Sequence, residues 1–229
     1  PGHSSAASDV YKRQAFKYVT RYFDRITRPE QILQTFPQAI QTMIDPADCG
    51  PACISLSQDV QGETFDYPEE FFNEKIHTIR RPRPEDYQIK QAADLIKKSK
   101  NPIIISGGGI FYSDAMKELS QFAKKHNIPT AQTVMGYSTM KKDDPYFLGA
   151  IGGFGGKAPN DFMKKTDLAI AIGTKLADFT TGSWTNFENP NFKLVSINVS
   201  RFDANKHMAQ SVIGDAKVCI QDLTVALGL

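Results

Sequence analysis

Two glycine-containing turns have the residue types and spacing that could bind a phosphate. Ser106-Gly107-Gly108-Gly109 and Gly173-Thr174-Lys175 each follow a short apolar run. Between a strand and a helix, free backbone amides and the helix dipole favour an anion. The dinucleotide fingerprint needs a glycine at position 112, where Tyr112 stands, and no Gly-Lys-Ser/Thr follows. Tight packing of the turns is therefore the favoured interpretation, with nucleotide binding as the alternative.

The other side chains that could do chemistry are scattered along the sequence. The three cysteines fit no zinc spacing, and we expect them to be reduced; they are Cys49, Cys53 and Cys219. His126 and His207 have no metal-binding or catalytic partner in view, so we expect surface groups near the C-terminal ends of helices. No nucleophile elbow of the Gly-x-Ser-x-Gly type occurs. The sequence thus predicts no catalytic, cofactor-binding or metal-binding set of its own.

Length and charge describe an ordinary globular protein. Of the 229 residues, 41% are hydrophobic and 23% charged, and 27 Lys+Arg against 25 Asp+Glu give a net charge of +2. This balance provides no overall field for nucleic acid or anionic lipid. No apolar run approaches the ~20 residues that a membrane span needs. We therefore expect a cytoplasmic protein that binds neither nucleic acid nor membrane.

Strands and helices alternate through the second part of the sequence. Four continuous apolar runs precede turns rich in Gly, Ser, Asn or Asp, namely residues 102–106, 168–172, 194–197 and 212–213. Such runs are typical of strands that are covered on both faces. Strands that alternate with helices imply right-handed crossovers and a parallel sheet. The predicted fold class is therefore α/β, with an open parallel sheet.

Local signals predict where several elements begin and end. Thr27 and Glu30 have the spacing of a capping box before a helical stripe that stops at Asp45. Ser113 is expected to cap a helix that ends near Asn127. Further helices are predicted at residues 87–98, 159–165 and 216–227, and strands at 50–57 and 129–133. Five glycines between positions 149 and 156 predict a loop.

The sequence also suggests domain boundaries. Residues 1–14 are small and polar without periodicity, and we expect them to be a disordered, non-native leader. Residues 15–79 then form an incomplete α/β domain. Residues 80–85 are predicted to be a semi-rigid linker, because prolines two apart hold an extended backbone. Residues 86–229 form the domain with the parallel sheet.

Several motifs together resemble the thiamine-diphosphate-dependent enzymes. Residues 50–61, which begin Gly-Pro-Ala-Cys, are similar to the last strand of that family's pyrimidine-binding domain. Four further stretches are similar to successive parts of its Rossmann-like central domain, namely residues 101–109, 127–149, 167–174 and 213–216. The resemblance implies that residues 15–79 are the C-terminal part of a pyrimidine-binding domain and that residues 86–229 are the central domain.

This resemblance implies thiamine diphosphate and Mg²⁺ as cofactors of a full-length parent enzyme. The family's metal–diphosphate motif, Gly-Asp-Gly…Asn, does not occur here, and its activating glutamate lies in the part of the pyrimidine domain that the resemblance does not cover. We therefore expect the main ligands outside this sequence and a catalytically silent chain. Flavin-binding relatives carry Arg-Phe-Asp-Asp-Arg after Gly-Thr and a strand ending in Asp-x-Asp. Residues 175–179 and 198–200 depart from both patterns, which implies that no FAD binds.

Within the family, two regions are closest to the branch that hydrolyses a carbon–carbon bond of a cyclic 1,2-dione in inositol breakdown. The first region is residues 22–32 with 45–51, and the second is residues 178–184 with 198–199 and 202–207. The resemblance implies a small-molecule dione substrate and a homo-oligomeric parent, a dimer or a tetramer. Arg28 stands where related synthases carry a lysine, and a cation there could steer the dione or stabilise oxyanion charge. A solvated surface arginine is the alternative for Arg28. An acetohydroxyacid synthase-like transferase and a non-catalytic nucleotide-binding module are the alternative functions.

Overall fold

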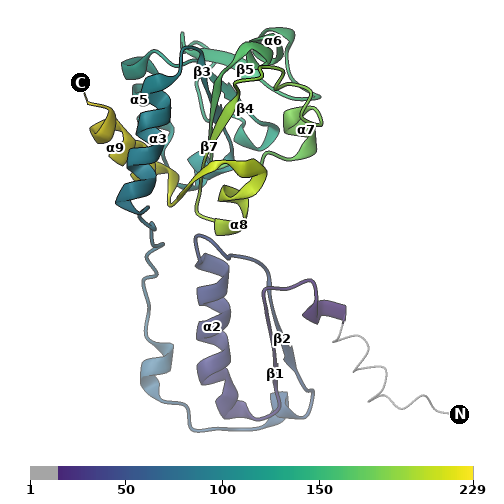
Figure 1. Cartoon of the computed structure of the whole chain (residues 1–229). Helices are drawn as coiled ribbons and strands as arrows, with labels where there is room; N and C mark the ends of the chain where they lie inside the picture. The colour runs from purple at the N-terminus through teal and green to yellow at the C-terminus, as the bar shows by residue number, and fades with distance from the viewer. Residues whose placement is uncertain (1–14, 229) are drawn as a thin grey trace, which may run out of the picture. The chain divides into compact units, whose positions relative to one another are not determined.

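The computed structural model describes residues 15–228 and divides the chain into two compact units (Figure 1). The first unit ends at Arg80 and the second begins at Arg81. Among the described residues, no helix is both long and apolar enough to cross a bilayer. Both units are α/β structures, in agreement with the predicted fold class.

The first unit is built from two parallel strands and the helix that connects them. β1 (Tyr22–Ile26) pairs with β2 (Ala52–Leu56), and α2 (Ile32–Ile44) lies between them in the chain. Three short 3-10 helices complete the unit: η1 (Pro29–Gln31), η2 (Val60–Gly62) and η3 (Glu69–Phe72). Most residues of both strands are only half-buried. A sheet of two strands is marginally stable at best without further packing.

The start of α2 differs from the predicted capping box. The side chain of Gln31 accepts hydrogen bonds from the backbone amides of Thr27 and Arg28, at 2.7 and 3.1 Å. Glu30 does not reach back to the amide of Thr27, and its carboxylate pairs with Arg28 instead. The helical turn begins one residue later than predicted, with Arg28 at the N-cap, so Gln31 rather than Glu30 stands at the third position.

The second unit contains a six-stranded parallel sheet, as the sequence predicted. The spatial order is β5-β4-β3-β6-β7-β8. The strands are β3 (Pro102–Ser106), β4 (Thr130–Gln132), β5 (Phe147–Ala150), β6 (Leu168–Ile172), β7 (Lys193–Asn198) and β8 (Gln210–Ile213). The chain runs outward from β3 to β5, then returns to β6 beside β3 and runs outward the other way. Open α/β sheets bind ligands at the carboxyl ends of the strands near such a reversal of order.

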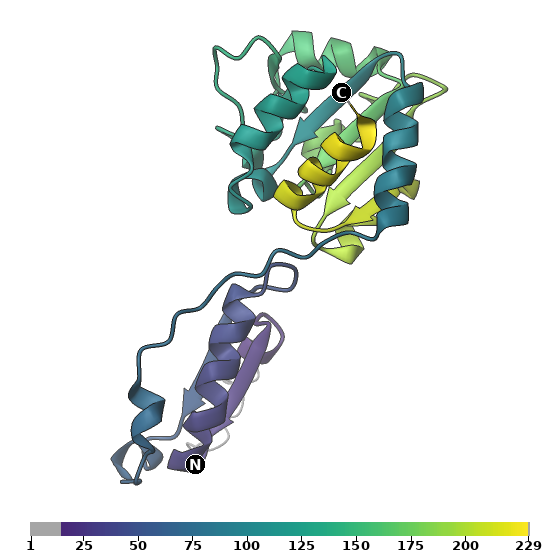
Figure 2. The same cartoon turned by 90° about the vertical axis from the view of Figure 1, so that its left-hand side faces the viewer.

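Helices cover one face of this sheet closely. α9 (Ala216–Leu227) packs there between α3 (Asp86–Lys98) and α5 (Met116–His126), and Figure 2 shows the three helices side by side. Ile104 and Ile170 point into the core beneath these helices, whereas their neighbours Ile103 and Ile105 belong to the core of the opposite face, which α6 (Lys157–Lys165) helps to cover. The strands read as continuous apolar runs because both of their faces are buried.

The predicted helix cap at Ser113 was wrong. Ser113 follows the short helix α4 (Gly108–Tyr112), and its hydroxyl donates to Asp215 Oδ2 at 2.8 Å. The longer helix α5 begins only after Ala115. Ser113 thus lies two residues before the N-cap position of α5, which Ala115 occupies.

The predicted loop at residues 149–156 was wrong in its first two residues. Gly149 and Ala150 pair with β4 and extend β5. Gly149 has a φ of +110°, a value open to glycine, so the residue that suggested a loop permits an irregular strand instead.

The remaining short elements contain too few residues to show a hydrophobic period in the sequence. They are η4 (Val134–Gly136), α7 (Asp178–Thr181), α8 (Arg201–Ala204) and η5 (Lys206–Met208).

The predicted linker is held against the second unit from Arg81 onward. Arg81 Nη1 donates to Asp215 Oδ2 at 3.0 Å, and Arg83 Nη2 donates to Asp222 Oδ1 at 2.8 Å. The amide of Asp215 donates to the carbonyl of Pro82 at 2.8 Å. The proline spacing indicated an extended backbone but carried no information about these partners, which lie more than a hundred residues further along the chain.

Candidate functional site

The two glycine turns meet where the strand order of the sheet reverses. The amide of Gly107 donates to the carbonyl of Ile172, and the amide of Gly109 donates to the carbonyl of Gly173, both at 2.9 Å. A Cβ on Gly107 would lie 2.4 Å from the carbonyl oxygen of Gly173. Gly173 itself has a φ of +63°, which favours glycine. Glycine at these positions lets two backbones touch, and both amides are already bonded.

A third turn closes over the same edge of the sheet. A Cβ on Gly136 in η4 would lie 2.3 Å from the carbonyl oxygen of Ser106, and a Cβ on Gly108 would lie 3.0 Å from the carbonyl oxygen of Met135. The hydroxyls of Ser106 and Thr139 are 2.7 Å apart and fasten the turn. A carbonyl oxygen so close to the glycine turn would repel a phosphate. The geometry therefore favours packing over nucleotide binding at this edge.

Asn198, at the end of β7, links two turns rather than facing a ligand. Its Nδ2 donates to the carbonyl of Thr174 at 3.2 Å, and its Oδ1 accepts from the amide of Ser200 at 3.0 Å. The side chain is buried. Both polar ends of the amide are thus used within the protein, and no carboxylate stands at this place to bind a ribose.

Arg28, the residue that the sequence singled out, lies just after the carboxyl end of β1. Its backbone is extended, and it directly precedes η1. The side chain is 76% exposed, and Nε lies 3.1 Å from Glu30 Oε1. A guanidinium carries five N–H donors, so most of them are available to a ligand. Within residues 15–228 the structure brings no other predicted site residue to Arg28, because the sequence named none.

A second arginine at this edge was missed by the sequence analysis. Arg25 lies in β1, and its Nη2 donates to Ser57 Oγ, directly after β2, at 2.8 Å. The neighbouring Asp24 accepts a hydrogen bond from Thr35 at 2.6 Å. The sequence signal that could have identified Arg25 is its place beside Asp24 inside a strand. Two adjacent charged residues are uncommon in a strand unless each side chain has a partner.

Elsewhere the described residues offer no metal centre, and the buried thiol of Cys219 is not activated. No group of three or more His, Cys, Asp or Glu side chains within residues 15–228 could hold a metal ion. Burial raises the pKa of Cys219 to about 12, so this thiol stays protonated. His126 ends α5, as expected, but it is half-buried with its ring 4.7 Å from that of Phe122. Burial, and then the charge of Lys125, lower the pKa of His126.

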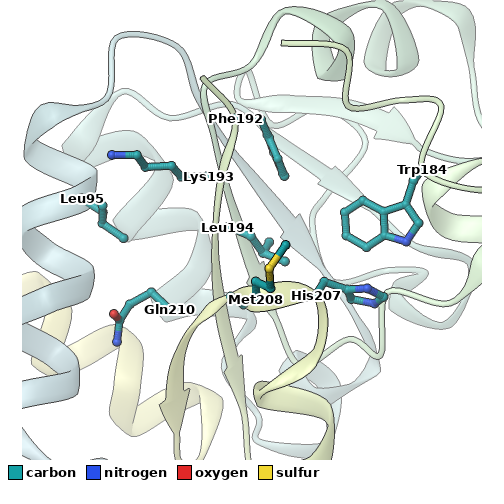
Figure 3. Close-up of a pocket in the computed structure, with 9 residues that line it drawn as sticks. Leu95, Trp184, Phe192, Lys193, Leu194, His207, Met208 and Gln210 are labelled. Carbon is teal, nitrogen blue, oxygen red and sulfur yellow. The ribbon is translucent and has the colours of Figure 1, made fainter. Parts of the chain in front are cut away.

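An open cavity of about 660 Å³ lies at the amino edge of β7 and β8, on the opposite edge from the glycine turns (Figure 3). Trp184 and His207 line it with their ring centroids 4.2 Å apart. His207 was expected at the end of a helix as an isolated surface group, but it lies in η5 against the indole. Burial, and then the charge of Lys206, lower the pKa of His207, although a hydrogen bond with the carbonyl of Leu176 opposes this.

Comparison with known proteins identifies the family. Residues 89–223 match the thiamine pyrophosphate enzyme central domain, which is more than half of the chain. The chain therefore belongs to the thiamine pyrophosphate enzymes, and the resemblance read from its motifs is confirmed. The parallel sheet of the second unit lies within the matched residues.

Particular relatives extend the match to nearly the whole chain. The chain is 46% identical over 218 residues to the 3D-(3,5/4)-trihydroxycyclohexane-1,2-dione hydrolase of Clostridium perfringens (strain 13 / Type A), covering 95% of this chain and 34% of that protein. It is 44% identical over 214 residues to 3D-(3,5/4)-trihydroxycyclohexane-1,2-dione hydrolase 1 of Bacillus cereus (strain ZK / E33L), covering 93% of this chain and 33% of that protein. The chain thus spans about a third of the length of these relatives.

A solved structure supports the fold of both units. The chain matches benzoylformate decarboxylase from Polynucleobacter necessarius with a TM-score of 0.76 at 21% identity, over 94% of this chain and 40% of that chain. At this identity the likeness concerns the fold alone.

Proposed function

We propose that this chain is part of a thiamine-diphosphate-dependent enzyme that hydrolyses a carbon–carbon bond of trihydroxycyclohexanedione in inositol catabolism. The observation that carries the proposal is the 46% identity over 95% of the chain to a hydrolase of that name. This match extends beyond the central domain at residues 89–223 into the first unit. The names of the relatives favour the hydrolase over an acetohydroxyacid synthase-like transferase.

The described residues do not fit as the binding site for the diphosphate and Mg²⁺. Magnesium prefers octahedral oxygen ligands together with phosphates, and residues 15–228 contain no suitable acidic cluster. The amides of Gly107 and Gly109 are bonded to the turn after β6. In this proposal both cofactors are held by other parts of the full-length enzyme, and FAD is not a cofactor. The isolated chain is then catalytically silent.

Arg28 is the residue that this chain contributes to the approach of the substrate. A dione is rich in electron density at its two oxygens, and an exposed guanidinium can steer it and stabilise negative charge that develops on oxygen. The free cysteines support a reducing compartment, so we place the enzyme in the cytoplasm. The parent would be a homo-oligomer, a dimer or a tetramer.

A chimera tests the proposed substrate. Residues 15–228 would replace the matching segment of the C. perfringens hydrolase, and hydrolysis of the dione would be measured. We expect kcat/KM within about tenfold of that enzyme, a loss of transition-state stabilisation below about 1.4 kcal/mol. The matched control carries the corresponding segment of the benzoylformate decarboxylase and should not hydrolyse the dione. A chimera that folds and binds its cofactor but leaves the dione intact would contradict the proposal.

The isolated chain provides a second test. Calorimetric titration with thiamine diphosphate and Mg²⁺ should give no heat of binding, and a dione assay should show no turnover. Micromolar binding of the cofactor, or hydrolysis by the chain alone, would show that residues 15–228 do contain the missing ligands.

A further inference from the structure

Two strained loops converge on the cavity at the amino edge of the second unit. Ser183 and Trp184 have φ values of +53° and +66°, and His207 and Met208 have values of +61° and +54°. Each left-handed residue other than glycine costs about 1–2 kcal/mol. Strained backbone persists where the surrounding structure holds it in place, and it clusters at binding and catalytic sites.

No packing of the Met208 side chain compensates for its strained backbone in this structure. Its side chain is fully exposed, so no burial of apolar surface compensates for the left-handed backbone. Figure 3 shows Met208 between His207 and the strand that carries Leu194, facing the cavity from its rim. A flexible thioether in that position is suited to close over a bound apolar group.

The cavity has an apolar side and a cationic side. Trp184 and Phe192 line the apolar side, and Lys193 lines the other (Figure 3). A neighbouring cavity of about 390 Å³ shares Phe192 and Lys193 and adds Lys98. Within residues 15–228 neither lysine has an ion-pair partner.

The one carboxylate on the cationic side is already engaged. Asp167 lines the neighbouring cavity, but it accepts hydrogen bonds from Ser99 and from the amides of Lys100 and Asn101. These donors are neutral, so Asp167 keeps its negative charge, but the two lysines outnumber it and leave this side of the recess with a net positive charge. Charge complementarity then favours an anion at this side, while the indole and phenyl rings favour a flat apolar group at the other.

We propose that this recess is a binding site for a small molecule in which an aromatic ring is joined by a short arm to an anionic group. The ring lies against Trp184 under the side chain of Met208, and the anion lies at Lys193 and Lys98. Volumes of a few hundred Å³ are typical of small-molecule sites. The site is on the opposite sheet edge from the glycine turns and is independent of the dione chemistry proposed above.

The sequence contains a single tryptophan, which supplies a specific readout. In an isotope-labelled sample of the chain, the indole N–H of Trp184 gives one resonance. Titration with 4-phenylbutyrate should shift it saturably, with a millimolar Kd expected for a ligand of about 12 non-hydrogen atoms. The neutral 4-phenylbutan-1-ol should bind at least about threefold more weakly, since an exposed ion pair contributes a factor of up to about five. Hexanoate, which lacks the ring, should leave the resonance in place.

Variants then test the two sides of the recess separately. Lys193→Gln should weaken binding of 4-phenylbutyrate about threefold, whereas Lys142→Gln, an exposed lysine before β5, should not change it.

Met208→Gly should keep or raise the melting temperature, because glycine relieves the left-handed backbone, and should weaken binding. Ser138→Gly, at an exposed residue with a φ of +67°, is the matched control for strain and should leave binding unchanged. An unshifted Trp184 resonance at about ten times the expected Kd, or equal binding of the acid and the alcohol, would overturn the proposal.

Discussion

The backbone of Arg28 is fixed more firmly than its side chain. Gln31 accepts hydrogen bonds from the amides of both Thr27 and Arg28, so the residue has a defined place after β1. The guanidinium, in contrast, has one surface ion pair with Glu30, and such pairs contribute little to stability. A role in substrate approach can therefore be separated from a role in folding.

Replacing Arg28 by alanine in the full-length parent should lower kcat/KM by about 10²-fold, the loss expected when one stabilising donor is removed from developing oxyanion charge. The melting temperature should not change. Arg28→Lys should restore part of the activity, because it keeps the charge but not the planar fork. Arg80→Ala is the matched control, since the Arg80 side chain is also 76% exposed and has one weak ion pair. Equal kcat/KM for Arg28→Ala and the parent would leave Arg28 as a surface residue only.

The close contact of the glycine turns gives a prediction for Gly107. A methyl group at this position would overlap the carbonyl oxygen of Gly173, which is backbone and cannot rotate away. Gly107→Ala should therefore lower the free energy of unfolding by about 1–3 kcal/mol, as overpacking does. Gly153→Ala serves as control, because its nearest neighbour would be an ordinary contact at 3.7 Å. Chemical denaturation of both variants measures the difference, and equal midpoints would mean that the two turns can separate.

At the scale of elements, Asp167 joins the start of β6 to the loop between α3 and β3. Its carboxylate accepts hydrogen bonds from the amides of Lys100 and Asn101 at 2.8 and 3.0 Å, and one from Ser99. Burial alone would raise the pKa of Asp167, but these hydrogen bonds outweigh it and lower the pKa below the ordinary 3.8. The folded state therefore favours the ionised carboxylate.

This lowered pKa predicts an acid-dependent contribution to stability. The pKa of Asp167 is lower in the folded than in the unfolded state. The stability that this carboxylate contributes is therefore fully present above pH 3.8 and is lost as the pH falls through the folded pKa. Asp167→Asn should have a lower melting temperature than the wild type at neutral pH, and the difference in melting temperature should narrow as the pH drops below 3.8. Asp143→Asn, an exposed site, should follow the wild type throughout. A difference in melting temperature that stays constant with pH would show that the charge of Asp167 does not contribute to stability.

The sequence predicted those elements whose local signal agrees with their packing. β3, β6 and β7 were found because burial on both faces demands continuous apolar runs, and α9 was found with the bounds that the structure gives. β5 was missed because its pairing with β4 overrides the loop preference of Gly149. The site at Arg28 came from family resemblance, and its neighbour Arg25 did not, because the partner Ser57 lies 32 residues away. The cavity beside Trp184 combines residues from α3, from the connection between β6 and β7 and from the connection between β7 and β8, and no local pattern joins them.

At the scale of the whole molecule, the two units differ in how much core each one has. In the second unit both faces of the sheet carry fully buried side chains. In the first unit the strands are half-buried, and α2 leaves Phe36 and Met43 exposed. Exposed apolar side chains on a helix beside an open two-stranded sheet are liabilities for association. We therefore propose that the second unit folds autonomously and that the first depends on further packing.

The segment between the units gives a proteolytic prediction. Residues 73–80 form no helix or strand, and Ile76 and Ile79 are exposed. Trypsin should cut after Lys75 or Arg80, because the bonds after Arg81 and Arg83 precede prolines and resist the enzyme. The surviving core should begin at Ile76 or Arg81, as mass spectrometry would show. A resistant core made of the first unit would contradict the difference in packing.

Where the autonomous unit begins can be tested with two shortened chains. Residues 86–229 correspond to the domain boundary expected from the sequence, whereas residues 81–229 also keep Arg81 and Pro82. Asp215, whose side chain is only 6% exposed, contacts both of these residues as well as Ser113. Without Arg81 the buried carboxylate loses its cationic partner and keeps only neutral donors such as Ser113, and a hydrogen bond to a charged group contributes about 1.5–3 kcal/mol. The 86–229 chain should therefore melt about 4 °C or more below the 81–229 chain, and Asp215→Asn should reduce that difference. Equal melting temperatures would place the boundary after residue 85 and make Arg81 part of a free linker.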